Sequence, residues 1–167
     1  MRDNRVLSVL VEDKPGVLAR VSSLLARRGF NIHSLAVGPT ADAGLSTMTI
    51  VVMSAELEQV KKQLHKLVNV VKITELDPAT SIEREIMLVK INATPGRRGE
   101  VIDLARIFNA TPVDVAVNSI TLLMAGKPTK LNDFLDLVRP FGVMELVKSG
   151  RIGIRREPKV RKLKAVG

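Results

Sequence analysis

One short segment of the chain combines residue types that could receive a small polar ligand. An apolar stretch that reads as a β-strand ends just before Asp13, and apolar residues recur at helical spacing from Val17 onward. We expect Asp13 to cap this helix and Pro15 to occupy its first turn. Because Gly16 has no side chain, a ligand could approach the free backbone N–H groups near Val17 and Leu18. The alternative is an ordinary capped helix start that binds nothing.

Residues for catalysis or metal binding are few. Cysteine is absent, which excludes disulfides, thiolate metal sites and a cysteine nucleophile. The two histidines, His33 and His65, have no neighbours at ligand spacing, and we interpret both as structural or surface residues. Glu83 and Glu85 flank Arg84 and resemble a strand edge more than a carboxylate pair. No nucleophile elbow, phosphate-binding loop or dinucleotide glycine pattern occurs, so nothing argues for catalysis by this chain alone.

The net charge of +9 lies mostly near the end of the sequence. The segment 156–167 is rich in Lys and Arg, and such tails can bind nucleic acid or an acidic surface. More often they are solvated and disordered, which is what we expect here. Single-stranded RNA readers also need aromatic residues on central strands, and the four Phe residues do not lie there. We therefore do not expect nucleic-acid binding.

Length and composition fit one ordinary domain or two small ones. The chain has 167 residues, of which 46% are apolar but only 2% aromatic. No apolar run approaches the roughly 18 residues that a membrane span requires. The sequence Met1-Arg2-Asp3-Asn4-Arg5 leads directly into the first strand. We expect a cytoplasmic protein without a membrane anchor.

The elements that must position the 13–18 segment repeat one plan twice. In the first half we predict strands at 6–11, 30–37, 45–53 and 70–74, with helices from Val17 and from about Glu56, and a left-handed helix end at Gly29. In the second half we predict strands at 85–91, 114–117, 119–124 and 143–148, with helices around 101–108 and 127–138. Both halves read β-α-β-β-α-β. The fold class is therefore α+β, with two ferredoxin-like βαββαβ domains.

The boundaries follow from proline-punctuated segments. We place a first domain at 1–77, a linker at 78–83 and a second domain at 84–155. Each domain is small for independent stability. The first strand also carries apolar residues on both faces, although helices can cover only one face of such a sheet. Pairing between two chains would bury the remainder, so we expect a homodimer.

The 13–18 segment, Asp13-Lys14-Pro15-Gly16-Val17-Leu18, resembles the signature of ACT domains, which are small modules that bind amino acids. A more specific match is Arg27-Arg28-Gly29-Phe30-Asn31-Ile32-His33-Ser34-Leu35, followed by 45–50 and 62–70. Together with 83–90 and 149–153, these segments resemble the small subunits of acetolactate synthase (also called acetohydroxyacid synthase). The resemblance extends to about Arg155.

The resemblance implies a non-catalytic, regulatory subunit in branched-chain amino-acid biosynthesis. Family members bind a large catalytic subunit that uses thiamine diphosphate (ThDP), magnesium and FAD; the small subunit holds no cofactor. They raise its activity and confer feedback inhibition, usually by valine bound between the ACT domains of a dimer. The implied site consists of Asp13, Pro15, Gly16, Val17 and Leu18 of one chain with Asn31 and Ile32 of the other.

Two further points bear on this assignment. Many family members have Asn where Asp13 stands, so this chain adds a negative charge whose effect on effector affinity the sequence does not define. The second domain is our candidate for contact with the catalytic partner. The competing hypotheses are a free-standing ACT-type amino-acid sensor and a nucleic-acid-binding regulator that uses the basic tail.

Overall fold

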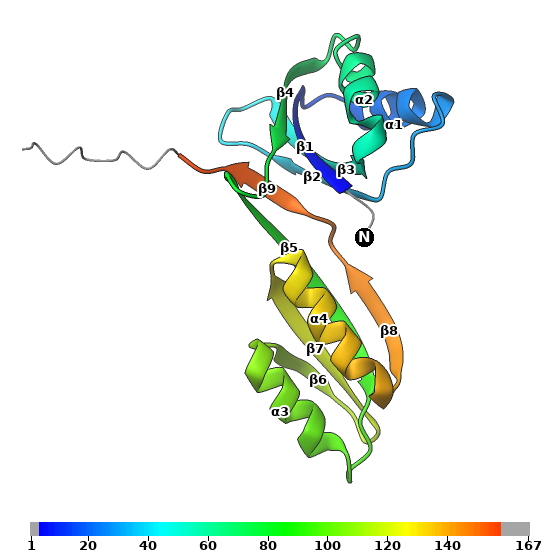
Figure 1. The fold of residues 1–167 in the computed structure, drawn as a ribbon, viewed down its shortest axis with the longest axis vertical. Coiled ribbons are helices and arrows are strands. Elements are labelled where there is room, and N and C mark those ends of the chain that lie inside the picture. Colours follow the sequence, from blue (N-terminus) through cyan, green and yellow to red (C-terminus); the bar gives the residue numbers. More distant parts are fainter. Residues whose placement is uncertain (1–3, 158–167) are drawn as a thin grey trace, which may run out of the picture.

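The computed structural model describes residues 4–157, and the two predicted α+β domains follow one another along this range (Figure 1). The first consists of β1 (Asn4–Glu12), α1 (Val17–Arg27), β2 (Ser34–Pro39), β3 (Leu45–Met53), a 3-10 turn (Ser54–Glu56), α2 (Leu57–Leu64) and β4 (Val70–Leu76). The strands form one antiparallel sheet in the order β2-β3-β1-β4. This is the ferredoxin-like arrangement that the sequence predicts.

Both helices of the first domain cover the same face of its sheet (Figure 1). Alternate residues of β1 point to that face, so that Leu7, Val9 and Val11 are buried in the core. From the helices, Val21 and Val60 contribute buried side chains to the same cluster. On the opposite face, a smaller cluster contains Val6, Val51 and Leu76. Val6 is therefore buried on the face of β1 that the helices do not cover, whereas Leu10 is only partly buried.

The second domain repeats the plan with β5 (Ser81–Asn92), α3 (Arg98–Phe108), β6 (Thr111–Val115), β7 (Ser119–Gly126), α4 (Pro128–Val138), a 3-10 turn (Arg139–Phe141) and β8 (Val143–Lys148). Its sheet has the order β6-β7-β5-β8, and a ninth strand, β9 (Ile152–Arg155), pairs with β5 outside that path. Phe134 is fully buried in the core of this domain, and its ring centroid lies 5.3 Å from that of Phe108.

The repeat extends to individual hydrogen bonds. In the first domain Glu12 N donates to Asn69 O at 2.9 Å, and in the second Asn92 N donates to Gly142 O at 2.9 Å. The register of β1 against β4 shifts at Leu10/Val11, and that of β5 against β8 shifts at Lys90/Ile91. A bulge at the same place in both domains shows that their architecture is duplicated in detail.

A two-stranded ribbon connects the domains. The first four residues of β5, 81–84, pair with β9, whereas 85–92 pair with β7 (Figure 1). The last three residues of the predicted linker 78–83 consequently lie in a strand. Arg156, which we assigned to the tail, donates its N–H to Thr80 O at 2.8 Å. The rest of the predicted tail, residues 158–167, lies outside the described residues.

Several predicted boundaries shift for identifiable reasons. α1 ends in a Schellman motif, with Gly29 at φ +74° and Phe30 N donating to Leu25 O at 3.1 Å, which confirms the left-handed helix end. After this motif the backbone does not pair with β3 until His33 N donates to Val51 O, so β2 begins at Ser34 rather than Phe30. The edge strand β6 begins at Thr111 and not at Asp114. Within 4–157, no helix is both long and apolar enough to cross a membrane.

Candidate functional site

The Pro-Gly segment forms a tight turn between β1 and α1. Gly16 has φ +84° and ψ −5°, the angles of the third residue of a type II turn, and Val17 N donates to Lys14 O at 3.3 Å. Pro15 fits the second position of such a turn, and glycine fits the third because φ is positive there. The prediction that Asp13 caps the helix is wrong, since Gly16 occupies the cap position with no side-chain cap. Pro15 likewise precedes the helix.

The turn leaves the start of α1 accessible. After the turn's own hydrogen bond from Val17 N, the next N–H to reach back is that of Arg20, which donates to Gly16 O at 3.0 Å. The N–H groups of Leu18 and Ala19 therefore lack a carbonyl one helical turn earlier. Nothing lies within 4 Å of a Cβ built on Gly16. A carboxylate could approach these donors, which lie at the positive end of the helix dipole.

A polar network that sequence reasoning missed holds the turn against the segment just before β4. Asn69 Nδ2 donates to Glu12 Oε2 at 2.6 Å, and Arg20 Nη1 donates to Asn69 Oδ1 at 2.8 Å. Lys14 Nζ pairs with Glu12 Oε1 at 3.0 Å. The hydrogen bond from Asn69, followed by that from Lys14, lowers the pKa of Glu12 below its ordinary value. The residues on either side of the turn are thus fixed by contacts distant in sequence.

The other predicted half of the site, Asn31 and Ile32, follows the Schellman motif at the far end of α1. Asn31 is exposed, while Ile32 packs partly against the first core. The backbone is then fixed by His33 N, which donates to Val51 O at 3.0 Å, and β2 begins with the next residue.

One chain does not bring the two halves together. The eleven residues of α1 span about 16 Å along the helix axis between them. The strand register gives the same separation. Ser34 and Val6 both lie opposite Val51 of β3, and the turn follows Glu12, which is six residues beyond Val6 on β1. That is about 20 Å of extended strand. Residues 13–18 and 31–32 lie at opposite ends of the first domain, so a single pocket containing both requires a second chain.

Three apolar residues near the two halves of the site differ in how far they are available to a ligand side chain. Leu18 and Val37 are 45% and 46% exposed and available for contact, whereas Ile32 is partly committed to the core. Val37 also lies beside a groove of about 550 Å³ between the outer face of β2 and β3 and the β5–β9 ribbon, with Ile152 and Ile154 on its other wall.

Comparison with known proteins bears on this geometry. Residues 7–72 match the family model described as an AHAS small subunit-like ACT domain, and residues 84–157 match that described as small subunit of acetolactate synthase. The acetolactate synthase small subunit of Mycolicibacterium smegmatis is 50% identical over 155 residues, covering 92% of this chain and 91% of that protein. The chain belongs to the acetolactate synthase small-subunit family.

Two more distant members of the family agree. A probable acetolactate synthase small subunit of Archaeoglobus fulgidus is 46% identical over 152 residues, covering 90% of this chain and 95% of that protein. The crystal structure of the acetolactate synthase small subunit from Thermotoga maritima has a TM-score of 0.84 with 35% identity, and the match covers 93% of this chain and 98% of that one. Both predicted domains therefore belong to one small-subunit architecture.

Among residues 4–157, no group of three or more His, Asp or Glu side chains is placed to hold a metal ion. The backbone N–H of His65 donates to Lys61 O at 3.0 Å at the end of α2, and its side chain is exposed. The residues that distinguish the site are instead the donors of the turn and the network behind it.

Proposed function

We propose that this chain is the regulatory subunit of an acetolactate synthase and that a branched-chain amino acid, valine first among them, is its effector. The observation that carries the proposal is the type II turn at Gly16, which leaves backbone donors open at the start of α1 in an ACT domain of this family. An amino acid needs donors for its carboxylate, an acceptor for its ammonium group and an apolar slot. The N–H groups of Leu18 and Ala19 can serve as donors, and the exposed Asp13 carboxylate can serve as acceptor.

The effector site would be shared by two chains. Because 13–18 and 31–32 lie at opposite ends of the first domain, a homodimer would join the turn of one protomer to Asn31 and Ile32 of its partner. A two-fold axis would then create two equivalent sites. Leu18 and Val37 are exposed and could enclose the aliphatic side chain. This arrangement supports the homodimer that the sequence favours.

The catalytic work would belong to a partner. A large subunit would hold ThDP, Mg²⁺ and FAD and condense pyruvate with a second 2-oxo acid, and this chain would raise its activity. Valine would inhibit by binding one arrangement of the regulatory dimer more tightly than another. The second domain is the proposed region of contact with the large subunit.

The first test is reconstitution. The chain should copurify with the acetolactate synthase large subunit, raise the rate of pyruvate consumption and make that rate sensitive to valine. If the large subunit is neither bound nor activated while the chain alone still binds an amino acid, the alternative of a free-standing ACT-type sensor is correct. Binding of nucleic acid that persists at moderate salt and is lost on deletion of 156–167 would favour the basic-tail regulator.

The second test addresses the turn. Gly16→Asp would place a carboxylate where the effector carboxylate binds, and we expect at least a tenfold loss of valine affinity by calorimetry with activation of the large subunit retained. Gly16→Asn is the matched control, because asparagine is also accepted at the third position of a type II turn and has a similar shape without the charge. Equal valine affinity in wild type and Gly16→Asp would disprove the assignment of the turn.

A further inference from the structure

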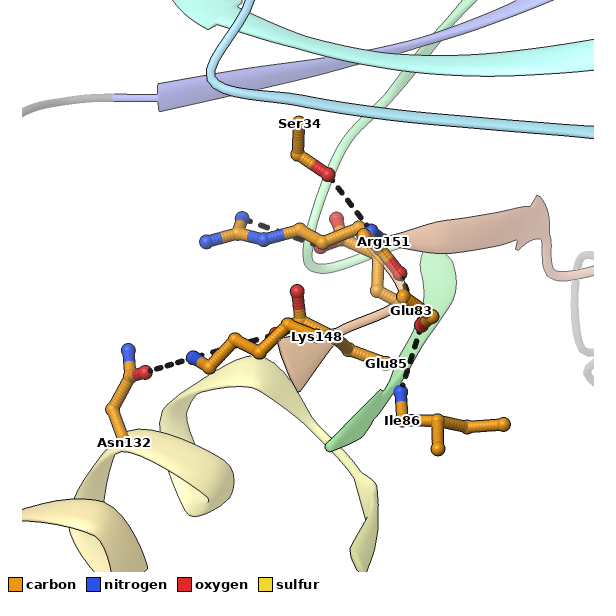
Figure 2. Close-up of polar contacts among 9 residues, drawn as sticks. Ser34, Glu83, Glu85, Ile86, Asn132, Lys148 and Arg151 are labelled. Carbon is orange, nitrogen blue, oxygen red and sulfur yellow. Dashed lines mark hydrogen bonds and ion pairs between the residues drawn. The ribbon is translucent and has the colours of Figure 1, made fainter. Parts of the chain in front are cut away.

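The chain makes a close contact between its two domains at the start of β2. The Oγ of Ser34 accepts a hydrogen bond from the backbone N–H of Arg151 at 2.9 Å (Figure 2). Gly150, just before it, has φ +82°. A Cβ built on Gly150 would lie 2.8 Å from Ser34 Oγ and 3.1 Å from Leu35 O. Glycine is therefore required here both by the backbone conformation and by the approach of β2.

On the side of the second domain, this contact is attached to β5. Ser149 N donates to Ile86 O at 2.9 Å, and Ile86 N donates to Ser149 Oγ at 3.0 Å. Arg151 Nη1 lies 3.7 Å from Glu83 Oε2, and the two side chains are only 26% and 14% exposed (Figure 2). The segment 149–151 is consequently held on both sides of Gly150. A displacement of Ser34 would be resisted by β5 rather than absorbed by a free loop.

On the side of the first domain, Ser34 is two residues from Ile32. The chain between Asn31 and Ser34 is fixed by the hydrogen bond from His33 N to Val51 O. A ligand at Asn31 and Ile32 would therefore act two residues from Ser34, which accepts the hydrogen bond from Arg151 of the second domain. The turn at Gly16 lies at the other end of the domain.

We infer that Ser34, seated against Gly150 and Arg151, is a positioning residue that couples occupancy of the effector site to the placement of the second domain. This inference rests on the proposed function, because it assumes that an effector contacts Asn31 and Ile32. The effector would favour one placement of Ser34, and the Ser34–Arg151 hydrogen bond would transmit that preference to β5. By linkage, the second domain would in turn bias the affinity for the effector.

The test separates effector binding from inhibition. Ser34→Ala removes the acceptor, and Ser22→Ala is its control, because the Ser22 hydroxyl donates only to Ala19 O within α1, at 3.1 Å. With the reconstituted enzyme, we expect Ser34→Ala to keep basal activation and measurable valine binding but to leave about three- to tenfold more residual activity at saturating valine, the size expected from one neutral hydrogen bond. Ser22→Ala should behave as wild type.

A second variant approaches the contact from the other domain. Gly150→Ala would push residues 150–151 away from Ser34, and we expect the same incomplete inhibition. Gly142→Ala is the matched control, since Gly142 also has a positive φ, +95°, but its Cβ would meet only Asn92 Cβ at 3.6 Å. Where backbone strain at a glycine with positive φ is the only effect, as in Gly142→Ala, valine should still inhibit the enzyme completely.

The outcomes are distinct. Complete inhibition of Ser34→Ala by bound valine would overturn the coupling role. Loss of valine binding in Ser34→Ala would place Ser34 in the effector site itself and would equally overturn it. If the wild-type chain neither binds valine in calorimetry nor confers inhibition, the proposed function fails first, and the Ser34 variants are not needed to show it.

Discussion

The side chain of Asn69 joins two parts of the first domain that are distant in the sequence. It donates to Glu12 at the end of β1 and accepts from Arg20 on α1, so it connects the residues that precede and follow the Pro-Gly turn. Its own side chain is largely buried, with 8% of the residue exposed. An amide suits this position because it offers a donor and an acceptor at once.

Replacing Asn69 by Ala should raise the pKa of Glu12. The hydrogen bond from Asn69 is the largest cause of the lowered pKa, and Lys14 is the next, so the pKa should rise toward 4.5 without fully reaching it. A carboxyl with a depressed pKa stabilises the fold above its unfolded pKa, and this contribution is lost as the pH falls through the folded pKa. Asn69→Ala should therefore weaken the dependence of stability on pH below about 4.5.

An NMR titration of the Glu12 side-chain carboxyl measures this directly. Lys14→Ala serves for comparison and should also raise the pKa of Glu12, because it removes both a hydrogen bond and a nearby positive charge. An unchanged Glu12 pKa in Asn69→Ala would show that the hydrogen bond does not persist in solution.

Residue-level prediction from sequence succeeded where the chemistry is local. Gly29 was recognised as a left-handed helix end because the Schellman motif involves neighbouring residues. The assignment of Asp13 as a cap failed because Pro-Gly specifies a type II turn, which moves the helix start to Val17. The contact between Asn69 and Glu12 could not be predicted, since 57 positions separate the partners and only the completed sheet brings them together.

At the scale of elements, β9 is the strand that the sequence did not predict. It has four residues, Ile-Gly-Ile-Arg, and although the two Ile residues alternate as in a strand, the segment is too short and too exposed for the pattern to be distinctive. It forms because β5 extends beyond its own sheet and offers an unpaired edge at 81–84. The longer elements were predicted because they alternate or repeat apolar residues over many positions, as β3 does over Leu45–Met53.

Gly153→Val tests the packing of β9 against the first domain. A Cβ at Gly153 would lie 2.7 Å from Leu76 Cδ1 and 3.3 Å from Ile82 O, and Leu76 is almost completely buried. We expect overpacking to lower the free energy of unfolding by about 1–3 kcal/mol in urea denaturation.

Gly99→Ala is the control, because we expect it to change the free energy of unfolding in the opposite direction. Gly99 lies in α3 with nothing within 4 Å of an added Cβ, so alanine should raise the free energy of unfolding by about 0.5–1 kcal/mol through its helix propensity. If Gly153→Val were as stable as wild type, the ribbon would not be packed closely against β4.

At the scale of the whole molecule, the two halves of the candidate site face away from each other. The turn at Gly16 follows the Glu12 end of β1, and Asn31 lies at the opposite end, where β2 meets Gly150. If two chains pair about a two-fold axis, each site would take the turn from one protomer and the 31–32 segment from its partner. An effector bound there would contact a segment directly joined to the partner's second domain.

This shared site predicts complementation between two defective variants. Gly16→Asp and Asn31→Ala should each abolish or strongly weaken valine binding in a homodimer, because every site contains one altered half. A mixed dimer, coexpressed and purified through two different affinity tags, would contain one site with both substitutions and one with neither. Calorimetry should therefore recover a wild-type affinity at about half the wild-type stoichiometry. If each site lay within one chain, both sites of the mixed dimer would remain defective, and no affinity would be regained.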